Sequence, residues 1–132
     1  MLVSVERHVK QSVIKKSIGL DFRSTDFNEI ISKLIKNSDV MIENFRPGTL
    51  EKMGFDFDRL QQINQKLILL RVSGFGQTGQ YTSRPGFGTL VESMSGFASK
   101  NGELNGGPLL PPLALADMIS GLYGSNAILM DL

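Results

Sequence analysis

The part of the chain that says most about its architecture reads DFNEIISKLIKNSDVMIENFRPG, residues 26–48. Its apolar side chains recur at the three- and four-residue spacing of one helix face, and Asp26 with Glu29 has the pattern of a capping box at the helix start. The residues on that face are Phe27, Ile30, Ile31, Leu34 and Ile35. The apolar run at residues 40–42 is typical of a strand, so the stretch predicts a helix that leads into a strand.

Two further apolar runs predict more strands of the same sheet. Residues 17–22 precede the helix, and residues 67–72 form a run that is apolar apart from Arg71 and bounded by polar residues. A run of this kind is typical of a strand that is covered on both faces, as in parallel sheets. Strands before and after a helix form a βαβ unit with a right-handed crossover. We therefore expect an α/β fold with a Rossmann-like parallel sheet of at least three strands.

The remaining helices follow from periodicity and glycine. Two short helical pieces are expected between the second and third strands, with a break at Gly54. Residues 73–88 are rich in glycine, serine, threonine and proline and predict a loop. Thr89 and Glu92 repeat the capping-box pattern ahead of the next helix. Residues 113–132 predict a helix that is apolar almost all round, without a stop signal, so we expect it to be buried in a larger protein.

Composition and charge exclude several classes of protein. The chain has 132 residues, enough for one domain, and its net charge of +1 leaves no basic stripe for nucleic acid. It has no cysteine and a single histidine, His8, which excludes thiolate and multi-histidine metal sites. Residues 1–16 alternate apolar and charged positions and read neither as a secretory signal nor as a membrane span. We expect a cytoplasmic protein without a metal, a membrane partner or a nucleic-acid partner.

A glycine-rich segment after the third predicted strand has the spacing of a dinucleotide-binding motif. Gly74, Gly76 and Gly79 match that spacing. In such a motif a helix begins within the glycines, so that its first amides hold the pyrophosphate. Here Pro85 and Gly86 interrupt the segment before any helical periodicity resumes. The sequence favours a flexible loop over a nicotinamide cofactor site.

The segment after the second predicted strand has residues that suit a nucleotide ligand. Open α/β sheets bind ligands at the carboxyl ends of their strands. Arg46 is suited to a bidentate contact with a phosphate, Asn44 to a polar group and Phe45 to the face of an adenine. The same residues fit a surface turn, which composition alone favours.

Asp117 lies among apolar residues at the expected start of the last helix. A carboxylate in such surroundings needs a structural or chemical reason, because burying an unpaired charge is unfavourable. One interpretation is an N-cap that accepts hydrogen bonds from free helix amides. The other is a nucleophile presented at a helix N-terminus. The two interpretations are compatible, and the residues alone leave both open.

Four motifs in a fixed order give the chain its resemblance to the family III (CaiB/BaiF) CoA-transferases. They read NFRPG at residues 44–48, SGFGQTG at residues 73–79, RPGFG at residues 84–88 and AD at residues 116–117. The resemblance covers residues 14–132, whereas residues 1–13 match less well. It implies a Rossmann-like segment of the large domain of a longer protein that forms an interlocked homodimer.

The resemblance also implies roles for individual residues. Asp117, in the pattern Ala-Asp-x-x-x-Gly, would attack an acyl-CoA thioester to form a mixed anhydride, from which a carboxylic acid acceptor is loaded. CoA is thus a substrate, and no permanently bound cofactor is implied. The implied CoA contacts are Leu20, Arg23, Asn44, Phe45, Arg46, Lys52 and Arg84. The wording RPGFG is similar to members that use dicarboxylic acids such as succinate.

Two alternatives remain beside CoA transfer. The family includes α-methylacyl-CoA racemases, which use a histidine in the loop before the helix at Thr89. Phe87 and its two glycine neighbours occupy that loop here, so the base is missing and transfer is favoured. The second alternative is a truncated, non-catalytic remnant that binds CoA or dimerises. If the 132 residues are the whole product, we expect an incomplete site with little activity.

Overall fold

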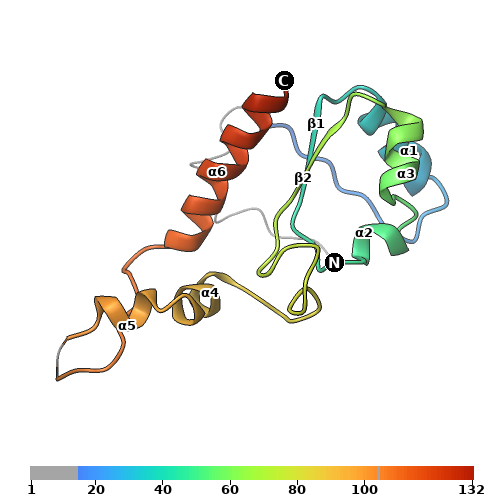
Figure 1. Cartoon of the computed structure of the whole chain (residues 1–132). Helices are drawn as coiled ribbons and strands as arrows, with labels where there is room; N and C mark the ends of the chain where they lie inside the picture. The colour runs from blue at the N-terminus through green and yellow to red at the C-terminus, as the bar shows by residue number, and fades with distance from the viewer. Residues whose placement is uncertain (1–14, 104) are drawn as a thin grey trace.

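The computed structural model describes residues 15–103 and 105–132 as a mixture of helices and a small parallel sheet. His8 and the poorly matched leader at residues 1–13 lie outside these residues. In chain order the elements are α1 (Phe27–Lys36), β1 (Val40–Glu43), α2 (Thr49–Lys52), α3 (Phe57–Ile63), β2 (Ile68–Arg71), α4 (Gly88–Met94), α5 (Phe97–Asn101) and α6 (Leu115–Asp131). Figure 1 shows the two strands between α1 and α3 on one side and α6 on the other. The predicted α/β class is confirmed.

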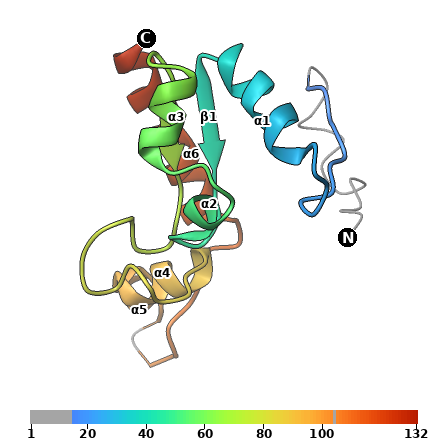
Figure 2. The ribbon, with the colours of Figure 1, turned by 90° about the vertical axis from the view of Figure 1, so that its right-hand side faces the viewer.

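The strands β1 and β2 are parallel, with Val40 opposite Ile68 and Glu43 opposite Arg71. Successive side chains of a strand point to opposite faces of the sheet. Leu69 accordingly packs against the core below α1 and α3, whereas the next residue, Leu70, contacts α6 at Gly124. Because the strands are parallel, both end at the same edge of the sheet, next to α4 (Figure 2).

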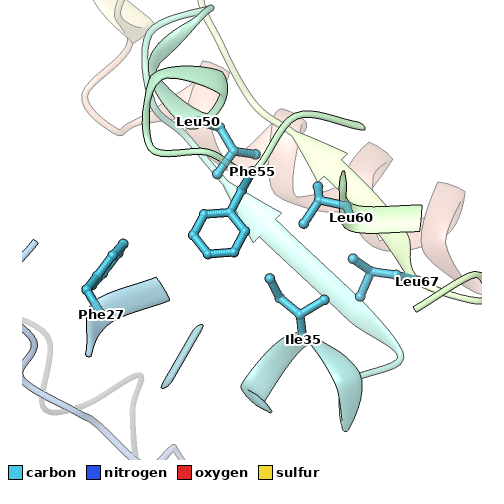
Figure 3. Close-up of a cluster of buried hydrophobic side chains, with 6 residues drawn as sticks. All are labelled: Phe27, Ile35, Leu50, Phe55, Leu60 and Leu67. Carbon is cyan, nitrogen blue, oxygen red and sulfur yellow. The ribbon is translucent and has the colours of Figure 1, made fainter. Parts of the chain in front are cut away.

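The core lies between α1, α2, α3 and one face of the sheet. Figure 3 shows the ring of Phe55 among aliphatic side chains from these elements. Phe27 meets Phe55 edge to face, with ring centroids 6.3 Å apart. The buried members of this cluster are Phe27, Ile35, Leu50, Phe55, Leu60 and Leu67. Gly54, at φ 84°, separates the helices α2 and α3 as predicted.

The strand predicted at residues 17–22 is wrong. The segment is irregular and mostly exposed, and the sheet in the described part of the chain has two strands. A strand needs a neighbour for its backbone hydrogen bonds. Here the segment ends in a local turn instead, in which the backbone N–H groups of Arg23 and Ser24 donate to Asp21. The parallel crossover of the structure is the connection from β1 to β2 through α2 and α3.

Neither predicted capping box forms. Asp26 makes no capping hydrogen bond to α1, and Glu29 instead pairs with Lys33 one turn later, at 2.6 Å. Thr89 does not cap α4, which begins at Gly88 with Phe87 as its N-cap. In both cases the glutamate has a better-placed partner than the amide of its own helix start.

The last two predicted helices differ from expectation in extent and burial. The helix expected after residue 88 is divided at Gly96, with φ 82°, into α4 and α5. α6 is present, but Gly124 is its single buried residue. Its apolar side chains are largely exposed because, in the described residues, the main packing partners of the helix are β2 and α4. Among them are Met118, Leu122, Tyr123 and Leu129. None of the described helices is both long and apolar enough for a membrane span.

Candidate active site

Asp117 lies in the first turn of α6, with its side chain exposed. Ala114 is the N-cap, which makes Asp117 the third residue of the helix rather than its cap. The N-cap interpretation of Asp117 is therefore wrong. Its carboxylate remains at the positive end of the helix dipole, where an anion is stabilised.

The cap that α6 lacks in its own sequence comes from α4. Glu92 is 8% exposed, and its Oε1 accepts the backbone N–H of Ala116 at 2.9 Å. The sequence pattern had assigned Glu92 to the start of its own helix. A partner 24 residues away was not detectable from helical spacing.

A cavity of about 520 Å³ lies in front of Asp117. It is bounded by Asn44 after β1, by Ser73 and Gly74 after β2, by the first turns of α4, and by the start of α6. The carboxyl ends of both parallel strands thus meet the N-terminus of α6 at this cavity. Open α/β sheets bind ligands at this kind of edge.

A second cavity, of about 290 Å³, is lined by two of the four cationic residues predicted for CoA. Its lining includes Phe45, Arg46 and Arg84. Neither guanidinium pairs with a carboxylate within residues 15–103 and 105–132. Arg84 lies over the ring of Tyr81, 4.1 Å from its centroid, which orients the guanidinium without neutralising it.

The two cavities adjoin, because five residues line both of them. These residues are Asn44, Ser73, Gly74, Gly86 and Phe87. The Ser73 hydroxyl is buried without a hydrogen-bond partner in the described structure. One continuous surface therefore leads from the Asp117 carboxylate to the two guanidinium groups.

Close backbone contacts shape this junction. A Cβ atom on Gly74 would lie 2.5 Å from the Cα of Gly86, and one on Gly88 would lie 3.2 Å from Oδ1 of Asp117. The other glycines of the false dinucleotide motif, Gly76 and Gly79, adopt positive φ in turns. No helix begins within that motif, since the next one starts at Gly88. The segment between β2 and α4 is a loop, as predicted.

The loop carrying Asn44, Phe45 and Arg46 is held by a buried acid. Glu43, whose side chain is 2% exposed, accepts the Phe45 N–H at 2.7 Å and Arg71 Nε at 2.6 Å. Arg71 also contacts Glu51 at 2.7 Å, and these hydrogen bonds lower the pKa of Glu51 and raise the pKa of Arg71. The sequence signal for this network was an acid and an arginine at the ends of two apolar runs.

The other residues predicted for CoA do not line these two cavities. Leu20 packs against the core, and Arg23 is exposed and pairs with Asp21 in its own turn at 3.2 Å. Lys52 is exposed at the end of α2. Their CoA contacts stay predictions.

Comparison with known proteins identifies the family. Residues 12–132 match the family model described as CoA-transferase family III. The chain belongs to this family. The predicted family III membership is thereby confirmed.

Individual family III relatives agree with this assignment. The chain is 43% identical to the succinyl-CoA–L-malate CoA-transferase beta subunit of Chloroflexus aurantiacus, over 94% of the chain and 31% of the relative. It is 40% identical to the succinate–glutarate CoA-transferase of Agrobacterium fabrum, over 86% of the chain and 28% of that protein. The crystal structure of a CaiB/BaiF family protein from Brucella suis superposes with a TM-score of 0.85, at 38% identity, over 89% of the chain and 31% of that protein. This family III chain therefore spans about a third or less of the length of these relatives.

Proposed function

We propose that this chain provides the nucleophile and part of the CoA site of a transferase that moves CoA from an acyl-CoA thioester to a carboxylic acid. One observation carries the proposal. The Asp117 carboxylate lines a cavity that adjoins a second cavity with Arg46 and Arg84. The names of the relatives support dicarboxylic acids as donor and acceptor, since they act on succinate with L-malate or glutarate.

In the proposed first step, a carboxylate oxygen of Asp117 attacks the thioester carbonyl carbon. The new C–O bond forms as the C–S bond breaks, the CoA thiolate leaves with the electron pair, and a mixed anhydride remains on the enzyme. The attacking carboxylate is presented from the first turn of α6, at the edge of the larger cavity. Covalent catalysis of this kind divides one difficult exchange into easier steps.

The second cavity supplies the contacts that CoA needs. Arg46 and Arg84 bind phosphate oxygens through charge-assisted hydrogen bonds, and Phe45, 37% exposed, stacks on the adenine. Asn44 and Ser73 lie at the junction of the cavities, where their polar groups contact the amides of the pantetheine arm. Leu20, Arg23 and Lys52 are proposed as further CoA contacts on the family resemblance alone.

The racemase alternative has less support from the site. Proton exchange at an α-carbon needs a second acid–base group opposite Asp117. Apart from Asp117, Glu92 is the single titratable side chain among the described residues of the larger cavity, and it is bound to Ala116. The loop in which the racemases of the family have their histidine reads Gly86, Phe87 and Gly88 here.

Assembly is proposed from the family resemblance alone. In the full-length protein we expect an interlocked homodimer. The apolar side chains exposed along α6 support its burial against another part of that assembly.

The test is intact-protein mass spectrometry after incubation with succinyl-CoA, followed by hydroxylamine and peptide mapping. We expect a mass gain of one succinyl group, and a hydroxamate at Asp117. Asp117→Ala should abolish both, whereas Asp131→Asn, at the far end of the same helix, should retain them. CoA binding without any adduct would favour the non-catalytic remnant. Deuterium incorporation at the α-carbon in heavy water would favour the racemase.

A further inference from the structure

Glu92 is a buried acid that has no role in the proposed transfer reaction as described so far. It is 8% exposed in the second turn of α4, next to the cavity of Asp117. A buried carboxylate is unfavourable unless hydrogen bonds compensate it. Among the described residues its hydrogen-bond partner lies on α6, not on its own helix. The position of Glu92 therefore depends on the contact between the two helices.

That contact is made next to Asp117. Glu92 Oε1 accepts the N–H of Ala116, the residue that precedes Asp117 in the first turn of α6. The first amides of a helix have no partner within the helix, and the N-cap here, Ala114, has no side-chain acceptor. Glu92 thus takes the place of an N-cap from another helix.

The same face of α4 also lies beside the Asp117 carboxylate. Gly88 precedes Glu92 by four residues, and positions four apart share one helix face. The space where a Cβ of Gly88 would stand is 3.2 Å from Oδ1 of Asp117. α4 therefore lies beside the Asp117 carboxylate at Gly88 and binds the preceding backbone amide, that of Ala116, through Glu92.

We propose that Glu92 is a positioning residue, whose hydrogen bond to the Ala116 amide orients the first turn of α6 and so directs the Asp117 carboxylate into the cavity. The proposal rests on the proposed function of Asp117. What it requires of Glu92 is an acceptor oxygen at this place, not a negative charge. Glu92→Gln keeps that oxygen, whereas Glu92→Leu keeps the approximate size and removes it.

The kinetic test measures the rate of succinyl-adduct formation on Asp117 as a function of succinyl-CoA concentration. Glu92→Leu should lower the maximal rate by about tenfold to a hundredfold, because small displacements of a reacting group have effects of this order. The half-saturating concentration should stay within about twofold, since ground-state binding is unchanged. Glu92→Gln and the control Ser93→Ala, on the exposed side of α4, should stay within about threefold of the parent rate.

Two structural measurements by NMR make the test independent of activity. Amide exchange at Ala116 should be slow in the parent and in Glu92→Gln, and at least about tenfold faster in Glu92→Leu. The carbon-13 resonance of the Asp117 carboxyl should move in Glu92→Leu alone. If the parent forms no adduct, the proposed function fails, and these two signals still decide the positioning role.

Glu92→Ala is a second variant in case Glu92→Leu does not fold. It also removes the acceptor oxygen but adds no larger apolar side chain, so it should slow the adduct and speed exchange at the Ala116 amide, as Glu92→Leu does. Three results would overturn the proposal: an Ala116 amide that remains protected in Glu92→Leu, a Glu92→Gln variant as slow as Glu92→Leu, or a loss that lies in the half-saturating concentration.

Discussion

Replacing Arg71 by methionine should destabilise the chain by removing the partner of a buried carboxylate. Arg71 donates from Nε to Glu43 at 2.6 Å and from its terminal nitrogens to Glu51 at 2.7 and 3.3 Å. The Glu43 side chain is 2% exposed and that of Glu51 is 38% exposed. Without Arg71, the Glu43 charge would retain only the Phe45 N–H as a described donor.

The size of the effect follows from this difference in burial. Removing one partner of a buried ion pair costs about 3–5 kcal/mol. Arg71 is still 18% exposed, which admits some solvent, so we expect the lower end of that range, about 3 kcal/mol. Glu51→Gln removes only the outer pair and should cost about 0–1 kcal/mol.

Urea unfolding followed by circular dichroism at neutral pH measures both variants. A loss of about 3 kcal/mol lowers the midpoint by about 1–3 M at ordinary urea dependences. The double variant Glu43→Gln with Arg71→Met is the decisive control, because a neutral amide still accepts the Phe45 N–H but leaves no buried charge. It should recover at least half of the lost free energy of unfolding. A cost below about 1 kcal/mol for Arg71→Met, or a double variant as unstable as the single one, would refute the reasoning.

Three further outcomes are expected. Hydrogen bonding to Arg71 lowers the pKa of Glu51 in the folded chain. The stability that this pair contributes is therefore present above the ordinary glutamate pKa and is lost as pH falls through the lowered pKa. In urea titrations at acid pH, the difference in unfolding free energy between the parent and Glu51→Gln should vanish. Gly74→Ala places a Cβ 2.5 Å from the Gly86 Cα, where no flexible side chain can yield. Urea unfolding should show a loss of about 1–3 kcal/mol in the free energy of unfolding, and calorimetry should show a weaker affinity for CoA. Unchanged values for both would contradict the close approach of the two glycines. Arg84→Met should raise the calorimetric Kd for CoA about tenfold to a hundredfold. The Kd for pantetheine, which lacks the phosphates, should not change. An equal effect on both ligands would exclude a phosphate contact.

Short-range pattern was enough for most of the elements. α1, the break at Gly54 and the two strands were predicted because side-chain periodicity and glycine act on neighbours in the chain. The strand at residues 17–22 failed because a strand depends on a partner that local pattern does not reveal. α6 was predicted as a buried helix, but its apolar side chains are exposed. The hydrophobicity of a helix does not reveal which other element, if any, packs against it.

The site shows the same division. The motifs singled out Asp117 and the loop from Asn44 to Arg46, and the structure brings them to adjoining cavities with Arg84. It does not bring Leu20, Arg23 or Lys52 there.

What the amino-acid sequence determined was the family, most of the helices and strands, and the residues that can carry chemistry, since these depend on residue type and on spacings within a few turns. What only the tertiary structure decided was which side chains hold the others in place. Glu92 meets Ala116 across 24 residues and Glu43 meets Arg71 across 28. A buried carboxylate forms hydrogen bonds with the donors that packing brings next to it. For Glu92 that donor depends on how α4 packs against α6, and for Glu43 it depends on how β1 pairs with β2.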